Sequence, residues 1–347
     1  LLMKVLRLYA PKDFRMHDEP IPAPGYKEAL IKVGSVGICA SDIHWWRDGH
    51  IGSTHLSDPL VLGHEASGIV EAVGDGVTNV QPGQRVAIEP SKPCMQCEFC
   101  KSGHFNVCPT VMFFGTPPTD GCLREYIVWP AELLLSVPNS ISLDEAAMLE
   151  PLAVGIYAVD LADVSPGETC VILGAGAIGL SVLQSLKAVG ISRILVADPV
   201  PARRDAALKF GAESVCDPSE VHTAAKALTS GRGFDIVFEC AGDAQAVRET
   251  AKLARVLGRV VIVGIPREDE YPFDAGNARR KQLSAIFVRR SNLTTERGID
   301  VVLSGKIDAA GLATHTFPLE NAEEAFTLAE SKSDGVIRAV IRIHDTL

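Results

Sequence analysis

Four of the nine cysteines fall within fifteen residues, at Cys94, Cys97, Cys100 and Cys108. The x2 spacing lets neighbouring thiolates reach one ion, and Zn²⁺ takes four ligands at tetrahedral corners, about 2.3 Å from each sulfur. Because four thiolates fill that shell, we predict a structural zinc site that holds a loop in shape and performs no chemistry. An iron–sulfur cluster is one alternative, but ferredoxins place the fourth cysteine at x3, whereas Cys108 follows Cys100 at x7. Unligated or redox-active thiols are the other alternative.

Size and charge limit what else the chain does. Its 347 residues exceed the length at which one hydrophobic core usually keeps growing, so two domains are expected. Hydrophobic residues at 47% and charged residues at 22% are typical of a globular protein. The net charge of −10 disfavours a nucleic-acid partner, which requires a basic face. Only Lys92 and Lys101 lie near the cysteine cluster, so a zinc-ribbon nucleic-acid module is disfavoured too.

A cytoplasmic location, with no membrane partner, is expected. The segment LLMKVLRLYAPKD is too short and too soon charged for a signal peptide. Residues 169–186 carry no charge, but Gly174, Gly176 and Gly179 interrupt them, which favours a strand, a turn and a helix over a membrane span. A reducing compartment makes disulfides improbable and favours metal or redox roles for clustered cysteines.

The pattern of apolar residues changes near residue 152. Residues 1–150 hold short Val- and Ile-rich runs separated by Gly and Pro, which predicts a largely antiparallel β domain. Beyond it, predicted strands alternate with helices and imply a doubly wound parallel sheet. After about residue 291 a helix and a strand return to the first domain. The predicted parallel strands are 169–174, 193–198, 213–217, 234–242, 258–265 and 282–288.

The motif GAGAIG places Gly174, Gly176 and Gly179 at the G-x-G-x-x-G spacing, after a predicted strand and at the start of a predicted helix. In this context the glycines let the backbone approach a pyrophosphate, which the helix N-terminus stabilises. Asp198 ends the next predicted strand, where its carboxylate would bind the adenosine ribose and repel a 2′-phosphate. NAD is therefore expected, although Arg203 and Arg204 nearby leave NADP open.

Three further segments carry a resemblance: GICASDIHWW (37–46), LGHEASG (62–68) and MLEPLAVG (148–155). Together with the cysteine cluster and the glycine motif, their order resembles the zinc-dependent medium-chain alcohol dehydrogenase family over nearly the whole chain. VAIEP, TPPTDG, EPLAVGI and HTFPLE resemble most the sorbitol and other polyol (xylitol, arabinitol) dehydrogenases. The resemblance implies a GroES-like, mainly antiparallel β catalytic domain and a Rossmann coenzyme domain. The catalytic domain would comprise 1–151 and 289–347, with a structural-zinc lobe at 90–110, and the NAD-binding domain 152–288.

The resemblance also implies a second, catalytic zinc held by Cys39, His64 and Glu65. Glu150 would be either a ligand or one water away; ethanol-oxidising relatives have a cysteine in its place. Ser41 and His44 match the family's proton relay from the substrate hydroxyl through the coenzyme ribose to solvent, although a packing histidine is the alternative for His44. Glu65 and Glu150 are accordingly expected among the catalytic residues.

Twelve positions match the family's coenzyme contacts, and four match its substrate contacts. Sorbitol dehydrogenases typically have Tyr where Trp45 stands, and Arg-Tyr where Arg289-Arg290 stands. A second arginine suits a carboxylate or a phosphate, so the neutral hexitol substrate is in doubt, unless Arg290 faces solvent. The expected substrate residues are Trp45, Glu150, Arg289 and Arg290. The expected coenzyme residues are Gly174, Gly176, Ile178, Gly179, Asp198, Arg203, Val263, Gly264, Ile265, Phe287, Val288 and Arg289.

The expected function is NAD-dependent oxidation of a secondary hydroxyl of a polyol to the ketose. The alternative substrate is an anionic or amino alcohol such as a sugar acid, a polyol phosphate or threonine; threonine dehydrogenases have Asp in place of Glu150. A non-catalytic, NAD-sensing member of the family is the remaining alternative. A homotetramer is the family's usual assembly.

Overall fold

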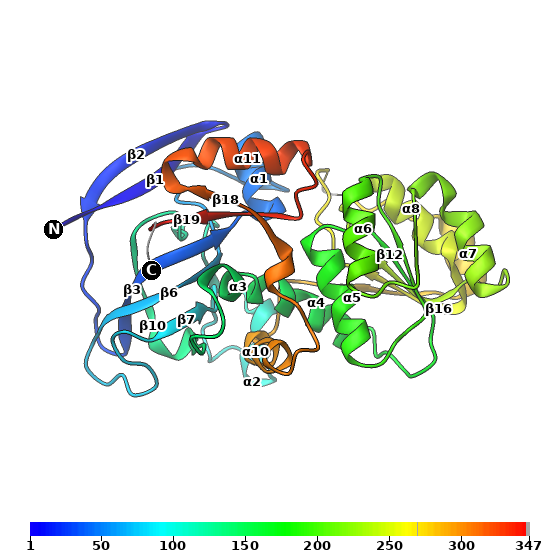
Figure 1. Cartoon of the computed structure of the whole chain (residues 1–347), viewed down its shortest axis with the longest axis horizontal. Helices are drawn as coiled ribbons and strands as arrows, with labels where there is room; N and C mark the ends of the chain where they lie inside the picture. Colours follow the sequence, from blue (N-terminus) through cyan, green and yellow to red (C-terminus); the bar gives the residue numbers. More distant parts are fainter. Residues whose placement is uncertain (269, 345–347) are drawn as a thin grey trace. The chain divides into compact units, whose positions relative to one another are not determined.

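The computed structural model describes residues 1–268 and 270–344 (Figure 1). The chain divides into two compact units, one formed by Leu1–Glu150 with Ala309–Leu347 and the other by Pro151–Asp308. No helix among the described residues is both long and apolar enough to cross a membrane.

A seven-stranded sheet forms the centre of the first unit. Its strand order is β11-β7-β6-β3-β19-β18, with β10 also paired to β3, and every pair is antiparallel except β18 with β19. The predicted antiparallel β domain is therefore confirmed. A separate ribbon pairs β1 with β2. The sheet strands are β3 (Glu28–Gly37), β6 (Glu65–Val73), β7 (Arg85–Ile88), β10 (Tyr126–Pro130), β11 (Leu134–Ser136), β18 (Ala313–Pro318) and β19 (Arg338–Arg342), and the ribbon is β1 (Leu2–Ala10) with β2 (Asp13–Pro20).

Helices cover this sheet and its ribbon. In Figure 1, α11 (Ala322–Ser331) lies along β18 and β19 and beside α1 (Ala40–Asp48). Trp46 of α1 and Phe326 of α11 are buried with their ring centroids 5.6 Å apart. Burying an aromatic side chain of this size contributes about 2 to 3 kcal/mol, so this contact holds α1 firmly in place. Smaller elements are α2 (Glu98–Lys101), α3 (Leu143–Ala147), β4 (His50–Ile51), β5 (Thr54–His55), β8 (Ser91–Lys92) and β9 (Met112–Phe113).

The second unit is a six-stranded parallel sheet with the order β14-β13-β12-β15-β16-β17. This order confirms the predicted doubly wound fold. Successive strands are added on one side of β12 and then on the other, so the strand order reverses between β12 and β15, the position at which such sheets bind dinucleotides. β16 begins at Ala254, four residues before the predicted start. The strands are β12 (Cys170–Leu173), β13 (Ile194–Ala197), β14 (Ser214–Cys216), β15 (Phe234–Glu239), β16 (Ala254–Ile262) and β17 (Ser284–Phe287).

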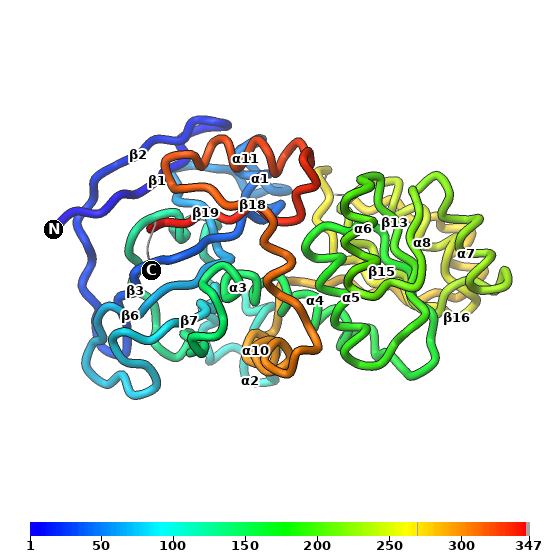
Figure 2. The backbone as a smooth tube through the Cα atoms, viewed as in Figure 1, coloured from blue at the N-terminus to red at the C-terminus, as the bar shows by residue number. Residues whose placement is uncertain are grey.

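Both faces of the parallel sheet are covered by helices. Figure 2 shows α5 and α6 on one side of the strands and α7 and α8 on the other. The central strands are buried throughout because both of their faces pack against helices, and all their residues are apolar except Asp235 and Glu239 in β15. The helices are α4 (Leu149–Leu161), α5 (Ala177–Ala188), α6 (Pro201–Lys209), α7 (Val221–Thr229), α8 (Ala244–Leu253), α9 (Ala275–Lys281) and α10 (Thr295–Leu303).

The return to the first unit occurs later than expected. The predicted boundary at residue 289 assigned 289–308 to the catalytic domain, whereas these residues belong to the second unit. The reason is local packing: Thr294 Oγ1 donates to the carbonyl of Ala153 at 2.7 Å, and Arg297 pairs with Asp160. Both contacts tie α10 to α4.

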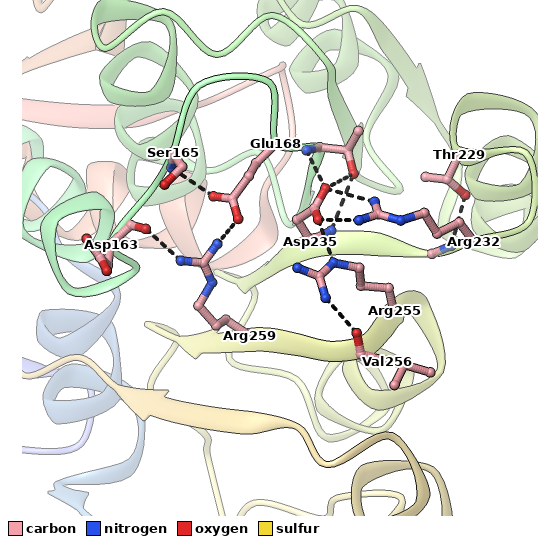
Figure 3. Close-up of polar contacts among 11 residues, drawn as sticks. Asp163, Ser165, Glu168, Thr229, Arg232, Asp235, Arg255, Val256 and Arg259 are labelled. Carbon is pink, nitrogen blue, oxygen red and sulfur yellow. Dashed lines mark hydrogen bonds and ion pairs between the residues drawn. The ribbon is translucent and has the colours of Figure 1, made fainter.

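A polar network joins the N-terminal ends of β12 and β15 (Figure 3). Asp235 is 5% exposed and accepts hydrogen bonds from the backbone and hydroxyl of Thr169, at 2.9 and 2.8 Å. Arg232 Nη2 and Arg255 Nε donate to it at 2.9 and 2.5 Å. Burial alone would raise the pKa of Asp235, but the bonds from Arg232, Thr169 and Arg255 hold it well below its usual value. The network therefore stabilises the sheet at the edge opposite the glycine motif.

Candidate metal and coenzyme sites

Three predicted zinc ligands come together in the first unit. The Cys39 sulfur, a His64 ring nitrogen and a Glu65 carboxylate oxygen lie within 4.8 Å of one another. The antiparallel register pairs Gly37 with Glu65, which brings the end of β3 beside the start of β6. A Cβ atom on Gly37 would lie 2.3 Å from Glu65 Oε2, so glycine makes room for the carboxylate. One sulfur, one nitrogen and one oxygen donor form the mixed set that suits a catalytic zinc.

Asp42 orients this group, a role that the sequence reasoning missed. It is 1% exposed; its Oδ2 accepts the backbone N–H of Cys39 at 2.9 Å, and its Oδ1 lies 3.4 Å from His64 Nδ1. Burial would lower the pKa of His64, but the neighbouring Asp42 charge raises it well above its ordinary value. A carboxylate at Nδ1 fixes the ring and leaves Nε2 for a metal. An acidic residue three positions after Cys39, in the first turn of a helix, was the available signal.

Arg338 is a second partner that the sequence did not reveal. Its Nη2 lies 3.0 Å from Glu65 Oε1, and its Nη1 donates to the carbonyl of Ile38 at 2.7 Å. The contact with Glu65 is an ion pair without hydrogen-bond geometry, and among the described residues neither Glu65 oxygen accepts a hydrogen bond. Burial raises the pKa of Glu65 despite this pairing. The carboxylate thus keeps lone pairs that a metal can use.

Glu150 lies near the group but outside it. It is 7% exposed at the start of α4, and the three-residue donor group found among the described residues does not include it. Burial raises the pKa of Glu150 to about 8, with smaller effects from His64 and Glu65. Of the two predicted roles, this placement favours the one in which a water separates Glu150 from the metal.

Ser41 and His44 are three residues apart on α1 and so lie on the same face of the helix. His44 Nδ1 is 3.3 Å from Arg47 Nη2 and 3.6 Å from Asp48 Oδ2. Trp45 is only 2% exposed and belongs to the hydrophobic core of this unit. The structure therefore gives Trp45 a packing role.

The four predicted structural-zinc ligands also converge, with their sulfurs within 4.8 Å of one another. Backbone N–H groups point at three of them: the amide of Cys97 donates to Cys94, that of Cys100 to Cys97 and that of Cys94 to Cys108, at 3.3 to 3.4 Å. Bonds from the amides of Gln96 and Cys97 lower the pKa of Cys94 to about 6, whereas burial raises that of Cys100 to about 12. A bound cation would ionise Cys100 as well.

The glycine motif has the geometry that a dinucleotide requires. Gly174 follows β12 directly, with φ +98°, and Gly176 precedes α5 as its N-cap. A Cβ atom on Gly174 would lie 2.9 Å from the amide of Ala241, and one on Gly179 would lie 1.8 Å from the carbonyl of Gly174. Only glycine fits at these two positions, so the turn keeps its amides open to a phosphate.

Asp198 follows β13 directly beside this turn. It is 3% exposed; its Oδ2 accepts the amide of Ala175 at 2.7 Å, and its Oδ1 accepts that of Val200 at 2.8 Å. A carboxylate has about four lone-pair positions, so two remain for ribose hydroxyls. Arg204 Nη1 donates to the backbone carbonyl oxygen of Asp198 at 2.7 Å. Arg203 is buried, and its Nη1 lies 3.8 Å from where a Cβ atom on Gly176 would stand.

The remaining predicted coenzyme residues lie along the same edge of the sheet. Ile178 is in the first turn of α5, Val263, Gly264 and Ile265 follow β16, and Phe287, Val288 and Arg289 end or follow β17. Ile265 and Phe287 are 47% and 55% exposed, so both can contact a ligand. Arg289 is exposed, whereas Arg290 is partly buried with φ +55°.

Two family models and curated relatives match this chain. Residues 25–139 match the alcohol dehydrogenase GroES-like domain, and residues 177–304 match the zinc-binding dehydrogenase domain. Sorbitol dehydrogenase of Bacillus subtilis is 36% identical over 94% of this chain and 93% of its own length. The Gallus gallus sorbitol dehydrogenase is 39% identical over 93% of this chain and 92% of its own.

Solved structures that share the fold of this chain are also dehydrogenases. An Escherichia coli dehydrogenase of unknown specificity superposes with a TM-score of 0.94, at 34% identity over 99% of this chain and all of its own. An E. coli alcohol dehydrogenase in complex with NADH (TM-score 0.90) and a Sinorhizobium meliloti zinc-binding dehydrogenase bound to NADP (0.89) are each 28% identical over 99% of both chains.

Two further solved neighbours are an idonate dehydrogenase and a galactitol-1-phosphate dehydrogenase, both from E. coli. L-idonate 5-dehydrogenase is 26% identical over 99% of both chains, with a TM-score of 0.89. Galactitol-1-phosphate dehydrogenase is 27% identical over 98% of this chain and all of its own, with a TM-score of 0.88. From its domains, its relatives and its fold, the chain belongs to the zinc-dependent medium-chain alcohol dehydrogenases, close to the sorbitol dehydrogenases, and is an alcohol or polyol oxidoreductase.

Proposed function

We propose that this enzyme oxidises a secondary hydroxyl of a sorbitol- or xylitol-like polyol to the ketose, using NAD and a catalytic zinc. The observation that carries the proposal is the group of Cys39, His64 and Glu65, three different donors held within 4.8 Å. The sorbitol dehydrogenases of Bacillus subtilis and Gallus gallus match more than nine-tenths of the chain, which supports a polyol as substrate.

Zinc at this group would supply a Lewis acid that lowers the pKa of the substrate hydroxyl, and the nicotinamide would accept the hydride. The chain's own residues prepare that step. Asp42 fixes the His64 ring, and Arg338 offsets part of the negative charge that Glu65 carries. Ser41 and His44 would pass the hydroxyl proton toward solvent. Glu150 would hold a water beside the group.

The second zinc belongs to the four cysteines, which supply only thiolates and leave no position for a substrate. NAD is the preferred coenzyme because the Asp198 carboxylate lies beside the glycine turn, where a 2′-phosphate would meet it. The solved neighbours include one with NADH and one with NADP, so this preference rests on Asp198. The homotetramer and the cytoplasmic location stay predictions.

One observation favours a second substrate class. Arg289 and Arg290 are adjacent, and guanidinium groups bind carboxylates and phosphates in a bidentate manner. The idonate and galactitol-1-phosphate dehydrogenases among the neighbours make a sugar acid or a polyol phosphate the alternative substrate.

Metal analysis and a substrate panel test the proposal together. We expect two zinc ions per chain and NAD reduction with polyols, in a panel that also contains sugar acids and polyol phosphates. His64→Ala should lose one zinc and all turnover, whereas the matched variant His55→Ala, at an exposed histidine, should lose neither. An active His64→Ala enzyme that keeps two zinc ions would contradict the assignment.

A further inference from the structure

A buried glutamate lies where the parallel sheet reverses direction, and the proposed mechanism does not use it. Glu239 ends β15, pairs with Leu173 at the end of β12, and is fully buried. Its Oε1 accepts the backbone amides of Ala241 and Gly242, both at 2.8 Å. Its Oε2 is buried and has no hydrogen-bond partner among the described residues.

Glu239 connects the loops that follow three neighbouring strands. Its Oε1 holds Ala241, whose amide would lie 2.9 Å from a Cβ atom on Gly174, so this segment backs the glycine turn after β12. Its backbone carbonyl accepts the amides of Val263 and Gly264 after β16, at 2.8 and 3.1 Å. A Cβ atom on Gly264 would lie 2.6 Å from Oε2. The side chain is thus packed between the pyrophosphate turn and the 263–265 loop.

The surroundings disfavour a negative charge here. Burial raises the pKa of Glu239 to about 7, against the opposing effect of the amides that it accepts. The interaction with Asp243, at the N-terminus of α8, adds to the rise. Titratable neighbours among the described residues also include the Cys240 thiol and Tyr271, whose hydroxyl donates to the carbonyl of Gly264 at 3.0 Å. β12 and β16 end here with the apolar residues Leu173 and Ile262.

We infer that Glu239 is a positioning residue for the coenzyme pyrophosphate, which in its uncharged form holds the loop behind the glycine turn and in its ionised form weakens binding. The inference rests on the proposed coenzyme site. Dinucleotides place their pyrophosphate at the reversal point of such a sheet, so an anion buried beneath it repels the two phosphate charges. Coenzyme binding and protonation of Glu239 therefore favour each other.

ADP-ribose is the probe, because it carries the pyrophosphate but no nicotinamide and therefore reports nothing about the metal group. Calorimetric titration of the full-length enzyme from pH 6 to pH 9 should show affinity falling about tenfold, which corresponds to a rise of one unit in the pKa of Glu239 on binding. Glu239→Gln, which removes the ionisation and keeps an acceptor for the amides, should bind with nearly constant affinity. Adenosine, which carries no phosphate, should show little pH effect.

Wild-type enzyme alone provides a second measurement, in case Glu239→Gln does not fold. Near pH 7.5, titrations in buffers of different ionisation enthalpy should reveal uptake of part of a proton when ADP-ribose binds. Parallel pH profiles for wild type and Glu239→Gln, or no proton uptake by wild type, would overturn the inference while leaving the coenzyme site intact. Failure of both proteins to bind ADP-ribose would overturn the coenzyme site itself.

Discussion

Replacing Asp198 by alanine should remove the preference of this enzyme for NAD. In the folded chain the carboxylate is 3% exposed and accepts the amides of Ala175 and Val200 at 2.7 and 2.8 Å. It lies at the end of β13 beside the glycine turn, where the adenosine ribose of a dinucleotide is bound. A 2′-phosphate would bring two negative charges against a buried one.

The size of the expected preference for NAD follows from the burial of the Asp198 carboxylate. Two unit charges about 4 Å apart interact by about 4 kcal/mol when the effective dielectric constant is about 20. Partial screening by the glycine-turn amides and by Arg203 reduces this to about 3 kcal/mol, and each 1.4 kcal/mol is tenfold, so wild type should favour NAD about a hundredfold in kcat/KM. The alanine variant loses that repulsion. It also loses ribose contacts and leaves two amides without their acceptor, which should lower NAD use about tenfold.

Steady-state kinetics with both coenzymes at one saturating polyol concentration provide the assay. NAD use should fall while NADP use rises, and this crossing separates a change of specificity from general damage to the fold. Asp205→Ala, which removes the same charge from an exposed position on α6, should leave both values unchanged. Equal losses with both coenzymes, or a wild-type enzyme that uses NADP as well as NAD, would refute the placement of Asp198 at the ribose.

Three further variants test the rest of the structure. Cys97→Ser should release about one zinc per chain and lower the melting temperature, because folding and metal binding are linked; unchanged metal content would exclude the structural site. Glu150→Ala should lower kcat while the dissociation constant of NAD stays within about twofold, since its carboxylate is near the metal donors; a larger effect on NAD than on kcat would contradict this. Asp235→Ala should cost about 3 kcal/mol in urea unfolding at pH 7, because it leaves Arg232 and Arg255 without their buried partner. Because folding lowers the pKa of Asp235, this contribution is complete above the unfolded-state pKa and declines as pH falls toward the folded-state pKa, so the difference between the two proteins should shrink in acid.

The sequence predicted those features that depend on local spacing. The glycine motif after an apolar strand predicted β12, the turn and α5. At Gly174 and Gly179 any other residue would press a Cβ atom against neighbouring backbone. The cysteine spacing predicted that the four sulfurs converge, because ligands from one short segment can meet without contacts from distant parts of the chain. Cys39 is distant in sequence from His64 and Glu65, and only the family resemblance grouped the three before β3 was seen to pair with β6.

Residues whose partners are distant in sequence escaped prediction. Arg338 meets Glu65 across 273 positions because β19 and β6 both pair with β3. Asp42 appeared in a quoted motif, but its bond to Cys39 depends on how α1 begins. Residues 289–308 were assigned to the wrong unit because no composition signal marks that α10 packs on α4.

Charge balance explains why the group of Cys39, His64 and Glu65 suits a metal ion. Asp42, Glu65 and Glu150 are all buried, and Arg338 is the cation that faces Glu65. Several buried carboxylates around Arg338 and His64 cost free energy unless further positive charge is present or protons neutralise them, and burial indeed raises the pKa of Glu65 and Glu150. A dication would supply that charge at the point where Cys39, His64 and Glu65 present their donors. A bound dication would offset the negative charge of these buried groups, and their burial would strengthen its effect as a Lewis acid on a substrate hydroxyl.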